Sequence, residues 1–168
     1  MERTLIAWVE DKPGVLNRVA SLFRRRAFNI ESLTVGHTEQ LGISRMTIVV
    51  DSDRTDVQKV AQNLYKLVNV IRVEDVTDQP AVMRDLALIR VRTNNGSRSE
   101  VMQLVDTFRA RVVDVGLNTL MIEVTGTEEK VEGLVEVIRP YGILEMVRTG
   151  QVAMVRGSNG NKPMTNEQ

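Results

Sequence analysis

The stretch LIAWVEDKPGVLNRVASLF, residues 5–23, decides the fold of the first half of this chain. Its first five residues are apolar and predict a buried strand, whereas the apolar residues from Val15 onward recur at helical spacing. Between them, residues 10–14 form a polar connection that contains Pro and Gly, as tight turns do. The stretch therefore predicts a strand, a turn and an amphipathic helix.

The predicted turn can also bind a ligand. The first N–H groups of a helix have no partners within the helix, and the aligned peptide dipoles make that end partly positive. Gly14 has no side chain, so a ligand can approach the backbone closely. Asp11 could cap the helix or hold an ammonium group. Together these groups suit a free amino acid, although they equally suit a well-capped helix start with Pro13 near its first turn.

The same order of elements occurs twice along the chain. After the first strand and helix, hydrophobic patterns predict strand, strand, helix and strand over residues 29–35, 43–50, 57–68 and 70–76. The second half repeats the order strand, helix, strand, strand, helix and strand over residues 86–91, 97–108, 111–115, 120–124, 127–141 and 143–155. We therefore expect an α+β protein of two tandem ferredoxin-like βαββαβ domains, each an antiparallel sheet with two helices on one face.

Two local patterns make narrower predictions. In the second strand, Ile30, Ser32 and Thr34 should share one face of the sheet. They alternate with Glu31, Leu33 and Val35, which should share the other face. Ser97 and Glu100 have the spacing of a capping box at the start of the third helix.

Composition shifts divide the chain into residues 1–78, a linker at 79–82, a second domain at 83–157 and a polar tail at 158–168, which we expect to be disordered. Each half is close to the lower size limit for a self-sufficient core, and its sheet has an uncovered face and two edges. We therefore expect a homodimer in which the first halves meet across a two-fold axis.

The composition excludes several classes of function. Lys plus Arg and Asp plus Glu both total 22, so the chain lacks the net positive charge of a nucleic-acid binder. It has no Cys and one His, too few for the usual zinc sites. No signal peptide and no stretch of about 20 apolar residues is present, so we expect a cytoplasmic protein with no membrane partner. No nucleophile elbow, P-loop or metal-ligand cluster supports an enzyme.

Other candidate residues have plainer interpretations. The second half carries the sequence TNNGS, residues 93–97, where the first half has its glycine turn, so a ligand site belongs to the first half. Asn29 follows the first helix and suits a helix end, but a two-fold dimer could bring it to the partner's turn. His37 has no partner at an informative spacing and suits a strand end. Arg24, Arg25 and Arg26 suit the negative end of the helix dipole.

Several motifs together resemble a known family. The turn at residues 10–16 resembles the amino-acid-binding turn of ACT domains. The strings NIESLTV (29–35) and SRMTIVV (44–50), with KLVNV (66–70) and RTG (148–150), are similar to the small regulatory subunit of acetolactate (acetohydroxyacid) synthase. The resemblance covers about residues 2–157 and identifies the first half as an ACT domain.

The resemblance implies a non-catalytic partner of a large subunit that uses thiamine diphosphate, Mg²⁺ and FAD, with none of these cofactors on this chain. The small subunit raises the activity of that enzyme and makes it sensitive to valine or another branched-chain amino acid. The effector would lie between two ACT domains of a dimer. Its carboxylate would meet the N–H groups around Gly14, Val15 and Leu16, and its amine would meet Asp11 and groups near Asn29 and Ile30 of the other subunit.

The chain differs from some relatives at one residue of the expected effector site, and its sequence also fits a second function. Position 11 is Asn in some relatives and Asp here, which changes the charge that meets the effector. A stand-alone tandem-ACT sensor that regulates transcription or another enzyme fits the same sequence, and copurification with a thiamine-dependent synthase would distinguish the two.

Overall fold

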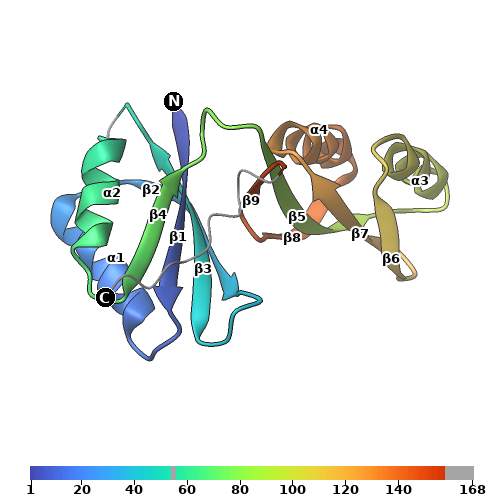
Figure 1. The fold of residues 1–168 in the computed structure, drawn as a ribbon. Helices are drawn as coiled ribbons and strands as arrows, with labels where there is room; N and C mark the ends of the chain where they lie inside the picture. The colour runs from blue at the N-terminus through green and yellow to red at the C-terminus, as the bar shows by residue number, and fades with distance from the viewer. Residues whose placement is uncertain (54–55, 158–168) are drawn as a thin grey trace. The chain divides into compact units, whose positions relative to one another are not determined.

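The computed structural model describes residues 1–53 and 56–157. The chain forms two compact units, one of residues 1–82 with 152–157 and one of residues 83–151 (Figure 1). Residues 152–157 thus group with the first unit, whereas the predicted second domain spans residues 83–157. The predicted disordered tail at 158–168 lies outside the described residues.

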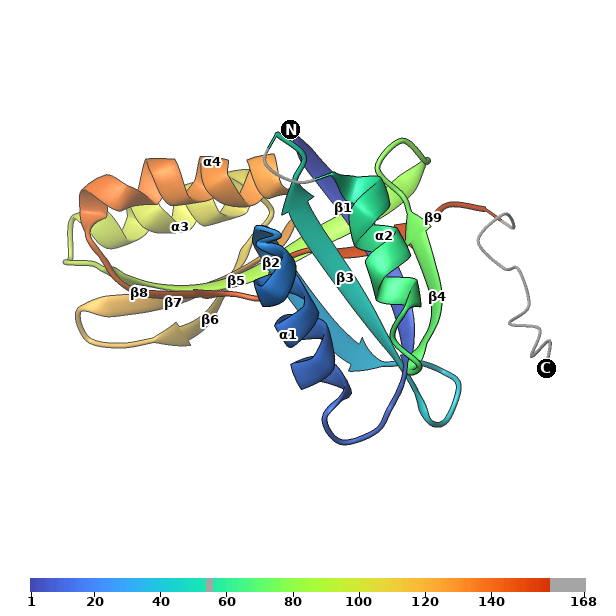
Figure 2. The same ribbon diagram turned by 90° about the vertical axis from the view of Figure 1, so that its left-hand side faces the viewer.

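The N-terminal unit has the predicted βαββαβ order. Its elements are β1 (Glu2–Glu10), α1 (Val15–Arg26), β2 (Ile30–His37), β3 (Ile43–Asp51), α2 (Val57–Tyr65) and β4 (Val70–Asp75). The antiparallel sheet has the order β2-β3-β1-β4, and both helices lie on one face of it (Figure 2). The prediction of a ferredoxin-like first half is therefore confirmed, with β2 and β4 as the edge strands.

Alternation along β1 builds the core of this unit. Leu5, Ala7 and Val9 are buried in one cluster with residues of both helices, among them Val19 and Leu64. A fully buried side chain of this size contributes about 1.5–3 kcal/mol. The apolar stripes of the two helices therefore hold them against the sheet and place the start of α1 beside the end of β1.

The structure contradicts the predicted alternation in β2. The register with β3 shifts between Ile30 and Ser32, which indicates a β-bulge. Ile30 then pairs with Val50 and packs against the core, together with Leu33. A bulge adds one residue to a strand and so changes which side chains share a face. Ile30 therefore does not share the face of Ser32.

The C-terminal unit repeats the plan. Its elements are β5 (Ala81–Arg92), which begins in the first unit, α3 (Ser97–Thr107), β6 (Arg111–Val115), β7 (Thr119–Gly126), α4 (Glu128–Ile138), the 3-10 turn Arg139–Tyr141 and β8 (Ile143–Arg148). The sheet has the order β6-β7-β5-β8, with α3 and α4 on one face (Figure 2). The single strand predicted at 143–155 is two, because β9 (Val152–Val155) pairs with β5 separately.

The predicted capping box at Ser97 and Glu100 is wrong. The side chain of Asn94 accepts hydrogen bonds from the N–H groups of Gly96 (2.9 Å) and Ser97 (2.8 Å). Glu100 instead accepts a hydrogen bond from the hydroxyl of Tyr141. Asn is as good a capping residue as Ser, and its position three residues before Ser97 lets its side chain reach the N–H groups of the turn.

The N-terminal cap of α2, Asp56, should make the free energy of unfolding decrease in acid. Asp56 accepts hydrogen bonds from the N–H groups of Lys59 (3.3 Å) and Gln58 (3.1 Å), and the bond from Lys59 lowers its pKa below the usual value. A lowered pKa in the folded state stabilises the fold above the unfolded-state pKa of about 3.9, and this stabilisation is lost as pH falls through the folded-state pKa.

We therefore expect Asp56→Ala to lower the melting temperature more at pH 7 than near pH 2.5. Thermal unfolding followed by circular dichroism at both pH values measures the difference. A melting-temperature loss that is equal at the two pH values would contradict a role for the ionised carboxylate.

Within the described residues, no helix is both long and apolar enough to span a bilayer.

Candidate functional site

The turn between β1 and α1 is open and is held by its backbone. Gly14 is the N-cap residue of α1 and has φ = 84°, the left-handed region that favours glycine. A Cβ atom built at Gly14 would meet nothing within 4 Å. The N–H of Asp11 donates to the carbonyl of Gly42 (2.8 Å), which ties the turn to the β2–β3 hairpin. A ligand therefore has room directly over the start of the helix.

The N–H groups at this helix start are partly engaged. The N–H of Val15 donates to the carbonyl of Lys12 at 3.3 Å. Among the described residues, the N–H groups of Gly14, Leu16 and Asn17 have no acceptor in the chain. Val15 is buried and Leu16 is about half exposed. The donors available to an anion therefore include the N–H of Asn17, which lies outside the predicted donor set of Gly14, Val15 and Leu16.

Asp11 does not cap the helix, since the hydrogen bonds of the described residues include none from a helix-start N–H group to its side chain. Its Oδ2 atom lies 3.2 Å from Nδ1 of His37, at the end of β2. The register explains the contact: His37 pairs with Ser44, and Ser44 pairs with Val9, whose side chain faces the helices. Directly paired residues share a face of the sheet, so His37 lies on the helix side, at the end where α1 begins.

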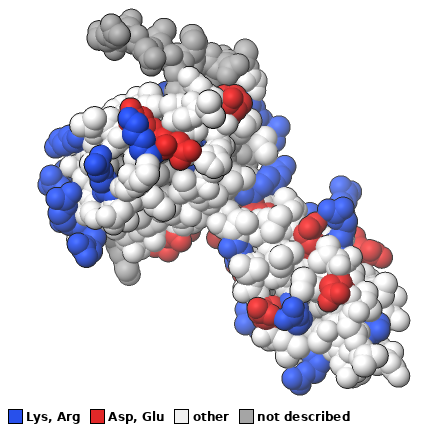
Figure 3. Space-filling view, turned by 90° about the horizontal axis from the view of Figure 1, so that it is seen from below, with Lys and Arg blue, Asp and Glu red and all other residues white. Residues whose placement is uncertain are grey.

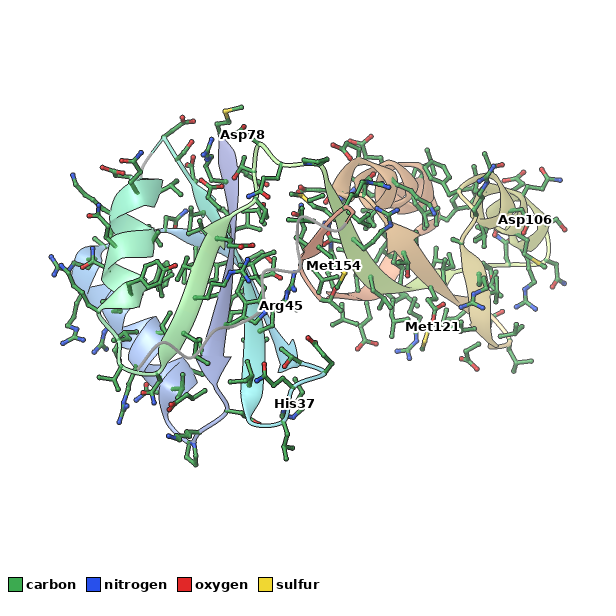
Figure 4. All side chains as sticks on the ribbon, viewed as in Figure 1. His37, Arg45, Asp78, Asp106, Met121 and Met154 are labelled. Atoms are coloured by element: carbon green, nitrogen blue, oxygen red, sulfur yellow. The ribbon has the colours of Figure 1, made fainter. Side chains whose placement is uncertain are left out.

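The prediction that His37 is a strand-end residue is confirmed, and Figure 4 shows it at the end of the β2–β3 hairpin. Its contact with Asp11 was not foreseen. The two residues are far apart in the sequence, and no local pattern relates the end of one strand to the end of another.

The remaining charged groups of the turn are paired with one another. Lys12 forms an ion pair with Glu10 (2.8 Å), and the buried Asn69 donates to Glu10 (2.9 Å). The hydrogen bonds from Lys12 and then Asn69 lower the pKa of Glu10. Arg18 donates to the side-chain oxygen of Asn69. Lys12 is therefore directed to Glu10 rather than to Asp11.

Asn29 and Ile30 lie at the other end of α1 from the turn. The helix runs from Val15 to Arg26, and a helix of 12 residues is about 18 Å long. Asn29 is exposed, and its side-chain amide donates to Glu31. Within one chain the candidate residues therefore form two groups, Asp11 to Leu16 at one end of α1 and residues 29–30 at the other.

The equivalent turn of the C-terminal unit is closed. Asn94 occupies the first N–H groups of α3. Arg98 donates to the carbonyls of Gly116 (2.7 Å) and Leu117 (2.6 Å) and so ties α3 to the β6–β7 hairpin. The two halves thus share a fold, but the Asn94 side chain covers N–H groups at the start of α3, whereas among the described residues no side chain caps α1.

The N-terminal unit also carries a cluster of arginines at the end of α1. Arg24, Arg25 and Arg26 are exposed in the last turn of α1, and Figure 3 shows Lys and Arg side chains along the margin of this unit where the helices lie. The described residues contain no group of three or more His, Asp or Glu side chains that could hold a metal ion.

A second hollow lies within the same unit, on the other face of the sheet. The indole of Trp8 lies between the guanidinium groups of Arg45 (4.9 Å) and Arg72 (4.7 Å). Arg45 donates to the carbonyl of Ala153 in β9, and burial lowers its pKa (Figure 4). A cavity of about 340 Å³ is lined by Trp8, Arg45 and Met154, among others. β9 belongs to the first unit, where its residue Ala153 contacts Arg45 and its residue Met154 lines this cavity.

The fold and the open turn define a class of protein: tandem ferredoxin-like domains, of which the first carries an open glycine turn before its first helix. Comparison with known families agrees. Residues 5–72 match the family described as the "AHAS small subunit-like ACT domain", and residues 84–157 match the "Small subunit of acetolactate synthase". The chain belongs to the acetolactate synthase small-subunit family.

Individual relatives cover nearly the whole chain. It is 52% identical over 158 residues to a probable acetolactate synthase small subunit of Archaeoglobus fulgidus, covering 94% of this chain and 99% of that one. It is 50% identical over 157 residues to the small subunit of Mycobacterium leprae, covering 94% and 93%. The crystal structure of the small subunit from Thermotoga maritima has a TM-score of 0.86 at 39% identity and covers 94% of this chain and 98% of that one.

Proposed function

We propose that this chain is a non-catalytic regulatory subunit. It raises the activity of the acetolactate synthase large subunit, which holds the thiamine diphosphate, Mg²⁺ and FAD, and it makes that activity sensitive to valine or another branched-chain amino acid. The observation that carries the proposal is the open start of α1 in a chain whose two halves both match the small-subunit family.

The turn offers complementary groups for the two charges of a free amino acid. The carboxylate of the effector would accept hydrogen bonds from the N–H groups at Gly14, Leu16 and Asn17, where the helix dipole also favours an anion. The ammonium would lie against the carboxylate of Asp11. Val15 would contribute little through its own N–H, since that group already donates to Lys12.

A two-fold dimer would join the two groups of candidate residues. β2 is an edge strand of its sheet, and edge strands often pair with a strand of another chain. Antiparallel pairing of β2 with its copy about a two-fold axis places the start of one strand beside the end of the other. Ile30 and Asn29 of one protomer would then lie near His37 of its partner, and His37 contacts Asp11. This arrangement completes the effector site from both protomers.

Regulation requires that the effector bind two states of the complex with different affinities, because equal affinities shift no equilibrium. A coupling free energy of about 1–3 kcal/mol is typical. The test is the rate of acetolactate formation by the cognate large subunit, with and without this chain, over a valine titration. The proposal predicts activation by the chain and its decrease with valine. No activation would contradict it.

Substitution of Asn29 should separate the two functions. Asn29 is exposed and assigned to the effector, so Asn29→Ala should lose valine sensitivity and keep activation. The exposed Asn95, in the closed turn of the C-terminal unit, is the matched control, and Asn95→Ala should keep both. Joint loss of activation and sensitivity in a folded Asn29→Ala dimer would show that Asn29 serves the partner surface instead.

A further inference from the structure

We propose that His37 is a positioning residue of the effector site and that its protonation opposes effector binding. The inference rests on the proposed function, because it concerns the same site. The observation behind it is the contact of 3.2 Å between Nδ1 of His37 and Oδ2 of Asp11, the carboxylate that would receive the ammonium group of the effector.

The chemistry of the contact differs between the two forms of the imidazole. A carboxylate has about four acceptor positions, so Asp11 can accept one hydrogen bond from a neutral His37 and still receive an ammonium group. With Nδ1–H donating to Asp11, the neutral ring would hold the carboxylate in place. The protonated ring instead adds a positive charge beside the site of the ammonium, and the two cations then compete for one anion.

Geometry keeps His37 at this position. It is the last residue of β2, its backbone is paired with Ser44 of β3, and its side chain lies on the helix side of the sheet. In the dimer proposed above, the partner's Ile30 would lie beside it. His37 therefore belongs to the strand end at which the two groups of effector residues would meet.

The other charged groups around the contact are carboxylates, a lysine and an arginine. Glu10 on β1 pairs with Lys12, which lowers the pKa of Glu10, and Arg18 on α1 donates to Asn69. Glu39 follows β2 in the hairpin loop. Carboxylate, lysine and arginine side chains ordinarily keep one charge between pH 5.5 and 8.5, whereas histidine titrates near 6.5. His37 is the single histidine of the chain, so a proton-linked change in affinity near this pH points to it.

The test measures the Kd of L-valine for the full-length chain by calorimetry at four pH values from 5.5 to 8.5. We expect binding to be about tenfold weaker at pH 5.5 than at pH 8.5, the size of the repulsion between two charges about 6 Å apart at an effective dielectric constant of about 40. Buffers of different ionisation enthalpy should show proton release on binding at pH 6.

Two variants, one with an uncharged side chain and one with a permanent positive charge, test whether His37 is responsible. His37→Gln can still donate to Asp11 but cannot be protonated, so its Kd should stay close to the wild-type value at pH 8.5 throughout. His37→Lys carries a constant positive charge, so its Kd should stay close to the wild-type value at pH 5.5. A His37→Gln variant with the full wild-type pH dependence, or equal affinity of both variants, would overturn the role of His37 while leaving the effector site intact. Absence of valine, leucine and isoleucine binding at every pH in the wild type would overturn the proposed function itself, and the inference with it.

Discussion

Gly14→Asp is expected to abolish the response to valine while the protein stays folded. The new carboxylate would lie over the N–H groups at the start of α1 and repel the carboxylate of the effector. A charge-assisted hydrogen bond contributes about 1.5–3 kcal/mol, so its loss weakens binding about ten- to a hundredfold. A Cβ atom at this position meets nothing within 4 Å, so the substitution should not disturb the packing.

Backbone strain is the effect to separate from charge in this experiment. Gly14 has a positive φ, which any other residue adopts at some cost, although Asn and Asp tolerate it best. Gly14→Asn is therefore the matched control, with the same shape and strain but without the charge. Calorimetry with L-valine should show much weaker binding to Gly14→Asp than to Gly14→Asn. Equal affinities would contradict the assignment of the effector carboxylate to this turn.

Arg148→Met is expected to destabilise the C-terminal unit more than any comparable surface substitution. Arg148 lies 2.7 Å from Asp85, whose side chain is 4% exposed. The other carboxylate oxygen of Asp85 is buried and has no hydrogen-bond partner. Removal of the guanidinium would leave a buried carboxylate without its cation, which typically costs about 3–5 kcal/mol.

The control for this prediction is another ion pair of the same sheet. Arg111 lies 2.7 Å from Glu123, but its side chain is 78% exposed, and pairs of this kind contribute about 0–1 kcal/mol. Urea unfolding should therefore show a large loss of stability for Arg148→Met and a small one for Arg111→Met. If Asp85→Asn restores much of the stability lost in Arg148→Met, the cause is the unpaired charge rather than lost packing.

Local sequence patterns predicted most of the fold. Strand and helix assignments depend on the spacing of apolar residues within one element, and the buried faces of β1 and α1 follow that spacing. One error occurred where pairing with another strand competes with local alternation, and the other where a different residue of the same turn caps the helix. The bulge after Ile30 turns that residue into the core, and the Asn94 side chain reaches the start of α3 before Ser97 can cap it.

The candidate site shows the same division. Gly14 could be predicted because a glycine before an amphipathic helix has a local signature, and the structure places it in the left-handed region. The engagement of the Val15 N–H by Lys12 depends on the conformation of the turn, which the residue types alone do not specify. The contact between Asp11 and His37 depends on the strand register, which sets how β1, β3 and β2 align.

The sequence by itself determined that the chain consists of two βαββαβ halves, that the first half has the turn EDKPG (10–14) before its helix, and that the second half has TNNGS (93–97) in the equivalent place. These features are local, because hydrophobic periodicity and glycine placement act within a few residues of each other. Only the tertiary structure decided that His37 lies against Asp11, that Arg148 neutralises Asp85, and that Asn94 closes the second turn. The first two contacts join residues from separate elements, so packing and strand register set them rather than spacing along the chain. The third joins residues two and three positions apart, and it depends on the conformation of the turn.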